Sequence, residues 1–141
     1  MLKALIPVDG SESSDRAVKH VIRLIKGREP MEVVVLNVQE PIAALEVRSH
    51  MPADEIRQWQ KTRGEEEMES AKAVLDEAGV AYIARVMIGD VGQTIVDVAR
   101  EQACDKIVMG IRGLEAIPGL LLGSVARKVV HLADVPVTLV K

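Results

Sequence analysis

The sequence predicts an α/β fold: a single domain with one open parallel sheet of five strands in the order 3-2-1-4-5 and helices on both faces. Five short apolar runs alternate along the chain with segments of helical periodicity, and such alternation is typical of parallel strands joined by right-handed crossovers. The runs Val33–Leu36 and Ile107–Met109 are continuously apolar, as in strands buried on both faces. The chain has one Trp, one Tyr and no Phe, so its core must be aliphatic.

The predicted strands are short and bounded by turn residues. Their ranges are Leu2–Val8, Glu32–Val38, Ala81–Ile88, Lys106–Gly110 and Pro136–Val140. In the predicted order the last strand lies at an edge, and an apolar edge strand favours pairing with another chain. This predicts a homodimer through Val135–Val140. The alternative is a monomer whose edge is shielded by Lys141 and a loop.

Helical periodicity predicts four helices between the strands. The first carries apolar residues from Ala17 to Ile25 and ends before Gly27. The third opens with Asp90-x-x-Gln93, a variant of the capping box. The fourth runs from about Ser124 to Leu132.

The second helix is predicted to start at Pro52 and to stop at Gly79. Its apolar positions are Ile56, Trp59, Met68, Ala71, Val74, Leu75 and Ala78. Its first half is very polar, so we expect that half to face solvent, with a bend at Gly64 and a solvated run at Glu65–Glu67. The irregular stretch Gln39–Met51 before this helix is interpreted as a connector, with a lid over a ligand as the alternative.

Composition excludes several classes of protein. A net charge of −3 leaves no electrostatic footprint for nucleic acid or an anionic membrane. Cys104 is the only cysteine, which excludes an internal disulfide or a thiolate metal cage, and we expect it to be buried. The three histidines lack metal-ligand spacing. No apolar stretch reaches the roughly 20 residues that span a bilayer, and the chain start lacks the pattern of a signal peptide, so we expect a cytoplasmic protein.

Ligands of open parallel sheets bind beyond the carboxyl ends of the strands, where the strand order reverses. For the order 3-2-1-4-5 this point lies between the first and fourth strands. The segments Pro7–Ser11 and Gly110–Gly113 would then face one crevice, which the end of the second strand at Val38 also borders. The sequence therefore predicts a binding site at this crevice.

The most informative pattern is Gly110-x2-Gly113 followed, after nine residues, by Gly123-Ser124. Glycines let the main chain approach a ligand, and a helix start offers unpaired N–H groups and a positive dipole end. Arg127 and Lys128 add positive charge one turn further on. Together these parts describe an anion cradle. From the spacing alone, two ordinary turns and an ordinary helix cap explain the pattern equally well.

The sequence resembles the universal stress protein A family, and the resemblance covers essentially the whole chain. The segments that carry it are Ile6–Ser11, Asp105–Gly110, Leu120–Ala126 and Val135–Val137. The nucleotide-binding branch of that family carries G-x2-G-x9-G-[ST], which Gly110, Gly113, Gly123 and Ser124 satisfy. The resemblance implies a homodimeric Rossmann-like protein of residues 1–141 that binds ATP or AMP, with or without Mg²⁺.

Carried over by position, the resemblance implies a complete set of nucleotide contacts. Asp9 would reach the ribose or adenine side, and the main chain of Val38 would pair with adenine. The set comprises Pro7, Val8, Asp9, Val38, Met109, Gly110, Arg112, Gly113, Gly123, Ser124, Val125 and Ala126. Two features depart from the family pattern. Ile111 replaces a small hydroxyl residue, and Pro118 and Gly119 stand in a spacer where charged residues are common.

Three functions remain open at this stage. The leading one is a regulatory protein of the stress response that acts by binding a nucleotide. The second is an enzyme, either a slow ATPase or a self-phosphorylating protein, for which the sequence offers no activated nucleophile. Asp9 is compatible with a general base or with a helix cap. The third is a dimeric scaffold that binds no nucleotide.

Overall fold

Five parallel strands form one sheet at the centre of the computed structural model, which describes residues 1–42, 50–112 and 122–141. The order is β3-β2-β1-β4-β5, as predicted, and every neighbouring pair is parallel. The elements are β1 (Leu2–Pro7), α1 (Glu12–Lys26), β2 (Met31–Gln39), α3 (Ala53–Glu77), β3 (Tyr82–Ile88), α4 (Val91–Glu101), β4 (Lys106–Gly110), α5 (Ser124–Leu132) and β5 (Val137–Val140). Each strand starts and ends within one residue of its predicted bounds.

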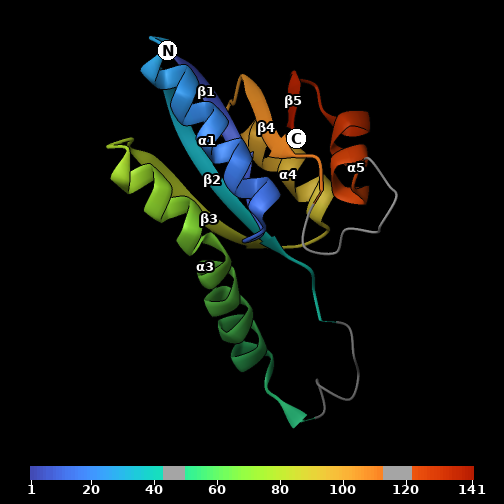
Figure 1. Cartoon of the computed structure of the whole chain (residues 1–141). Coiled ribbons are helices and arrows are strands. Elements are labelled where there is room, and N and C mark those ends of the chain that lie inside the picture. Colours follow the sequence, from blue (N-terminus) through green and yellow to red (C-terminus); the bar gives the residue numbers. More distant parts are fainter. Residues whose placement is uncertain (43–49, 113–121) are drawn as a thin grey trace.

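Helices cover both faces of the sheet, which confirms the predicted fold class. Helices α1 and α3 lie on one face, and α4 and α5 on the other (Figure 1). Successive residues of a strand point to opposite faces, so Ile6 of β1 packs against α1 and α3 while Leu5 packs against α4 and α5. Both side chains are fully buried. The continuous aliphatic runs of the sequence therefore fill two cores at once.

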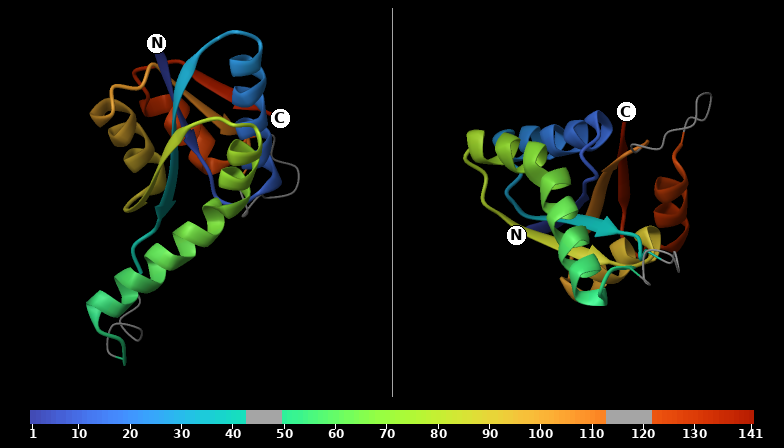
Figure 2. Two further views of the ribbon diagram at one scale, coloured as in Figure 1. Left: turned by 90° about the vertical axis from the view of Figure 1, so that its left-hand side faces the viewer. Right: turned by 90° about the horizontal axis from the view of Figure 1, so that it is seen from below.

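Helix α3 runs without interruption from Ala53 to Glu77, so Gly64, where the sequence predicts a bend, lies inside a continuous helix. Gly64 allows a close approach to the sheet. A Cβ atom on Gly64 would lie 2.6 Å from Cγ1 of Val86 and 2.8 Å from Oδ1 of Asn37. The N-terminal half of α3 continues past the end of the sheet (Figure 2), where it forms one wall beside the ends of the strands.

The capping box predicted for α4 is only half formed. The Asp90 carboxylate accepts a hydrogen bond from the Gln93 backbone N–H at 3.0 Å, which caps the helix. The Gln93 side chain does not reach back to the cap, since its amide donates to Asp97 Oδ1 at 2.9 Å. One side of the motif is therefore enough to start this helix.

Cys104 is buried, as predicted, and burial raises the pKa of its thiol.

None of the helices in the described parts of the chain is long and apolar enough to cross a membrane.

Candidate functional site

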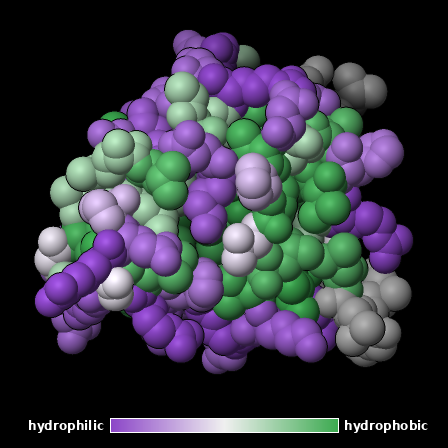
Figure 3. All heavy atoms as spheres, turned by 90° about the horizontal axis from the view of Figure 1, so that it is seen from above, coloured by the Kyte–Doolittle hydropathy of each residue, from purple (hydrophilic) through white to green (hydrophobic). Residues whose placement is uncertain are grey.

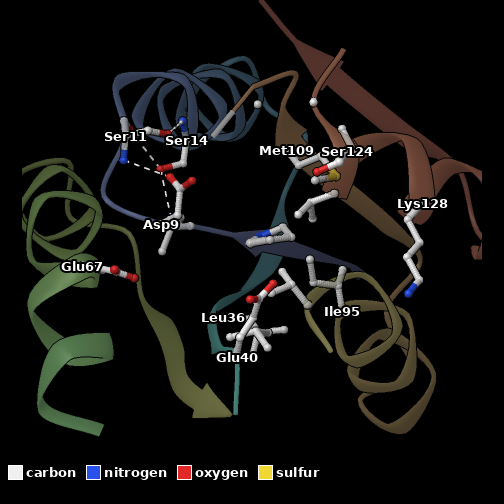
Figure 4. A pocket seen from close by; sticks show the side chains of 18 of the residues that line it. Asp9, Ser11, Ser14, Leu36, Glu40, Glu67, Ile95, Met109, Ser124 and Lys128 are labelled. Carbon is white, nitrogen blue, oxygen red and sulfur yellow. Dashed lines mark hydrogen bonds between the residues drawn. The ribbon is translucent and has the colours of Figure 1, made fainter. Parts of the chain in front are cut away.

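A cavity of about 890 Å³ opens beyond the carboxyl ends of β1, β2 and β4. It lies where the strand order reverses, between β1 and β4, at the position that parallel sheets use for ligands. Helix α3 borders it on one side and helices α4 and α5 on the other (Figure 4). Its volume falls in the range of about 300–1,000 Å³ that is usual for small-molecule sites.

The structure brings the predicted site residues that it describes to this one cavity. Those that line it are Pro7, Val8, Asp9, Val38, Met109, Gly110, Arg112, Gly123, Ser124, Val125 and Ala126. Gly113, Pro118 and Gly119 lie outside the described residues. Contact between these residues and a nucleotide stays a prediction.

The turn after β1 is held by side chains whose roles the sequence left open. Asp9 Oδ1 accepts a hydrogen bond from the Ser11 N–H at 2.9 Å, and Gly10 between them has a φ of +86°. Ser11, not Asp9, is the N-cap of α1, because its side chain accepts from the Ser14 N–H at 3.2 Å. Asp9 therefore braces the turn and at the same time faces the cavity.

Close packing of α1 against β4 requires a glycine at position 110, independently of the glycine motif. A Cβ atom at this position would lie 2.6 Å from the backbone C and O atoms of Ser13 and would collide with the Ser13 hydroxyl. Ser13 is buried in this contact between α1 and β4. The glycine therefore lets the first helix pack against the fourth strand.

The start of α5 presents backbone amides to the cavity. Gly123 is the N-cap, with φ −67° and ψ 158°, so no left-handed conformation requires a glycine here. Its N–H donates to the Ile111 carbonyl at 2.6 Å, and its own carbonyl accepts from the Arg127 N–H. In the first turn of a helix the N–H groups have no partner within the helix. Ser124, Val125 and Ala126 provide these groups beside the cavity.

Charge is divided between the two ends of the cavity. The acidic side chains that line the cavity are Asp9, which follows β1, Glu40, which follows β2, and Glu67 of α3. The cationic ones include Arg112, which follows β4, and Arg127 and Lys128 of α5. Figure 4 shows Asp9 and Glu67 on one side and Ser124 and Lys128 on the other. Arg63 on α3 is the exception, and it lies beside the Glu67 carboxylate at 3.6 Å. The cavity therefore fits a ligand with an anionic end and a hydrogen-bond-donating end.

Sequence reasoning missed the contribution of α3. Trp59, Gln60, Arg63 and Glu67 all line the cavity. The interval of four residues from Trp59 to Arg63 to Glu67 places these side chains on one helix face, and this spacing was the available signal. Arg63 lies over the Trp59 ring at 5.6 Å from its centre. Trp59, predicted as an apolar packing position, is 47% exposed.

Metal-ligating side chains are scattered over the described part of the chain. Among residues 1–42, 50–112 and 122–141, no three His, Cys, Asp or Glu side chains lie close enough together to hold a metal ion.

Known proteins match this chain over its whole length. The sequence profile of the universal stress protein family matches residues 1–141. This chain belongs to the universal stress protein family. Universal stress protein MJ0531 of Methanocaldococcus jannaschii is 33% identical over 141 residues, covering 99% of this chain and 81% of MJ0531. Universal stress protein YxiE of Bacillus subtilis is 32% identical over 146 residues, covering 99% and 98%.

Solved structures of universal stress proteins share the fold. The structure of hypothetical protein MJ0577 has a TM-score of 0.83 and 30% identity, covering 99% of this chain and 95% of that one. A universal stress protein in complex with cAMP has a TM-score of 0.73 and 23% identity, covering 99% and 97%. A universal stress protein family protein of Arabidopsis thaliana with AMP bound has a TM-score of 0.72 and 24% sequence identity, and the match covers 100% of this chain and 92% of that one.

Proposed function

We propose that this universal stress protein binds an adenine nucleotide, ATP or AMP, in the cavity beyond β1, β2 and β4. The observation that carries the proposal is the start of α5, where the first-turn amides and nearby cations face a cavity whose opposite end is acidic. Helix N-termini favour phosphate groups through their unpaired N–H groups and their dipole. Family structures solved with cAMP, with dAMP and with AMP support the same ligand class.

The charge distribution favours one orientation of the nucleotide. The phosphates would lie at Gly123–Ala126 with Arg112 close by, and Gly113 completes the set in the sequence motif. The sugar hydroxyls would lie near Asp9, whose carboxylate accepts hydrogen bonds and would repel a phosphate. The adenine would lie against the main chain of Val38. With ATP, Mg²⁺ would be held through the phosphate oxygens.

We propose that the protein acts in the cytoplasm as a regulator in the response to stress. In this role, nucleotide binding rather than turnover carries the signal. Incubation with ATP and Mg²⁺ followed by measurement of ADP tests the second point. Sustained ADP formation that Asp9→Ala abolishes would contradict it.

The proposal is tested most simply at Gly123. Its φ and ψ are open to any residue, so Gly123→Val should fold normally while its side chain fills the space of the phosphates. We expect ATP and AMP binding to be lost in isothermal titration calorimetry. Gly27→Val, at the far end of α1 and also with a negative φ, should bind as the wild type does. A folded Gly123→Val protein with wild-type affinity would contradict the site.

We further propose a homodimer through the edge strand β5. The N–H groups of Ile107 in β4 and of Ile111 just after it donate to the carbonyls of Pro136 and Val140, respectively. Because the N–H and C=O of one residue point the same way in a parallel ladder, those of Val137 and Leu139 point away from β4. Figure 3 shows apolar side chains gathered on the side of the molecule that carries β4, β5 and α5. A second copy of β5 would satisfy these backbone groups and cover apolar surface.

A further inference from the structure

Lys128 is placed to reach the phosphate end of the cavity but is held elsewhere in this structure. It follows Ser124 by four residues, so the two side chains share one face of α5. Helical side chains lean toward the N-terminus of their helix, and Lys128 lines the cavity. Figure 4 shows its side chain on the α5 side, directed toward α4.

Asp90 of the neighbouring helix neutralises this lysine. The Lys128 ammonium donates to Asp90 Oδ2 at 2.7 Å, and the same oxygen accepts from the Gln93 N–H at 3.0 Å. The hydrogen bond from Lys128 is the main cause that lowers the pKa of the Asp90 carboxyl. The carboxylate is therefore ionised at neutral pH, and it cancels a positive charge close to the proposed phosphates.

Gly92 gives the lysine stem its path across the start of α4. A Cβ atom on Gly92 would lie 2.8 Å from Cδ, 2.9 Å from Cγ and 3.1 Å from Cβ of Lys128. Both partners of the ion pair remain about half exposed, at 47% for Lys128 and 57% for Asp90. Exposed ion pairs are weak, so a more highly charged partner can displace the carboxylate.

We propose that Lys128 determines the preference for a triphosphate over a monophosphate, and that Asp90 competes with the phosphate chain for its ammonium group. The inference rests on the proposed nucleotide site and adds its selectivity. A single phosphate at the first turn of α5 is satisfied by backbone amides. A triphosphate carries more negative charge and extends further, so only its interaction with Lys128 is strong enough to replace the ion pair between Lys128 and Asp90.

A double-mutant cycle tests this competition. Dissociation constants for ATP and AMP would be measured for the wild type, Asp90→Asn, Lys128→Met and the double variant. Asn caps a helix as well as Asp does, and Met keeps the apolar stem that lies over Gly92. Asp134→Asn is the matched control, because it breaks another ion pair of α4, that with Arg100 at 2.6 Å, away from this cavity.

We expect Asp90→Asn to strengthen ATP binding about three- to fivefold and Lys128→Met to weaken it by a similar factor, as for the gain or loss of one exposed charged contact. AMP affinity should stay within about twofold in both variants. With Met at position 128, the Asp90→Asn substitution should have no further effect, and the control should match the wild type.

Two results would overturn the inference while leaving the site intact. The first is an unchanged ratio of ATP to AMP affinity in all variants. The second is an Asp90→Asn effect that persists in the double variant, which would mean that the Asp90 carboxylate repels ATP directly rather than through Lys128. A wild-type protein that binds neither nucleotide would instead overturn the proposed function, and this inference with it.

Discussion

Glu67 connects the polar face of α3 to the ends of two strands. Its Oε2 atom accepts hydrogen bonds from the side-chain amides of Asn37 at 2.9 Å and Gln39 at 2.8 Å. The Asn37 amide also donates to the Val8 carbonyl at 2.9 Å. The charge pattern of the sequence predicts a solvated acidic run at this position, and for Glu67 that prediction is wrong. A single carboxylate thus fixes the backbone on which Asp9 stands.

Removal of this carboxylate should destabilise the protein. Glu67→Ala removes one of the acceptors of the buried Asn37 and Gln39 amides, and we expect a loss of about 1–3 kcal/mol in the free energy of unfolding. Urea denaturation followed by circular dichroism measures it. Glu66→Ala, an exposed neighbour in the same helix, should change stability by less than about 0.5 kcal/mol. Equal effects of the two substitutions would show that the hydrogen bonds of Glu67 add no stability.

Helices α4 and α5 are joined by ion pairs near both ends of α4. Lys128 pairs with the cap residue Asp90, and Arg100 pairs with Asp134 just after α5. The hydrogen bond from Arg100 lowers the pKa of Asp134 below its ordinary 3.8. The native state therefore binds this proton less readily than the unfolded chain does. The pair contributes stability above the ordinary pKa and loses it as the pH falls through the native pKa.

Asp134→Asn should therefore change the acid dependence of stability. We expect the variant to be less stable than the wild type near neutral pH and the difference to shrink as the pH falls below about 4. Because the pair is exposed, the difference should also shrink in about 1 M salt. Urea denaturation over a range of pH measures both effects. A difference that grows toward acid pH would contradict the lowered pKa of Asp134.

At the scale of elements, strands were more predictable than the polar half of α3. Runs such as Val33–Leu36 indicate buried strands from hydropathy alone, and the crossover rule gives the handedness of the connections between them. In α3, hydropathy predicts the wrong exposure for both a polar and an apolar residue. Gln60 is buried because its amide donates to the Glu40 carbonyl at 2.5 Å, whereas Trp59 lies half exposed beside the cavity. Such positions depend on tertiary hydrogen bonds that periodicity does not carry.

The candidate site was predictable to the extent that strand ends and the glycine motif define it. Asp9 and Met109 follow from the rule for open parallel sheets. The close packing behind Gly110 did not follow, because the approach of Ser13 depends on how α1 lies on β4. For the same reason the pairing of Lys128 with Asp90 was not foreseen: the two residues are 38 positions apart in the chain.

For the whole molecule, the dimer proposal makes β5 the critical edge. Thr138→Glu would place like charges opposite each other where two copies of β5 meet, which is destabilising across strands. We expect this variant to sediment as a monomer in analytical ultracentrifugation. Ile83→Glu adds the same charge to the opposite edge strand β3, where Ile83 is exposed, and should leave the dimer intact. A wild-type monomer, or a dimeric Thr138→Glu protein, would contradict the interface.

The central claim is that nucleotide phosphates bind the backbone amides at the start of α5. Amide-resolved NMR titration of the labelled protein with AMP tests it most directly. We predict that the resonances of Ser124, Val125 and Ala126 shift strongly and saturate together with those of Asp9 and Val38. If AMP at saturating concentration does not shift the amide resonances of Ser124, Val125 and Ala126, the claim is contradicted, whichever other resonances shift.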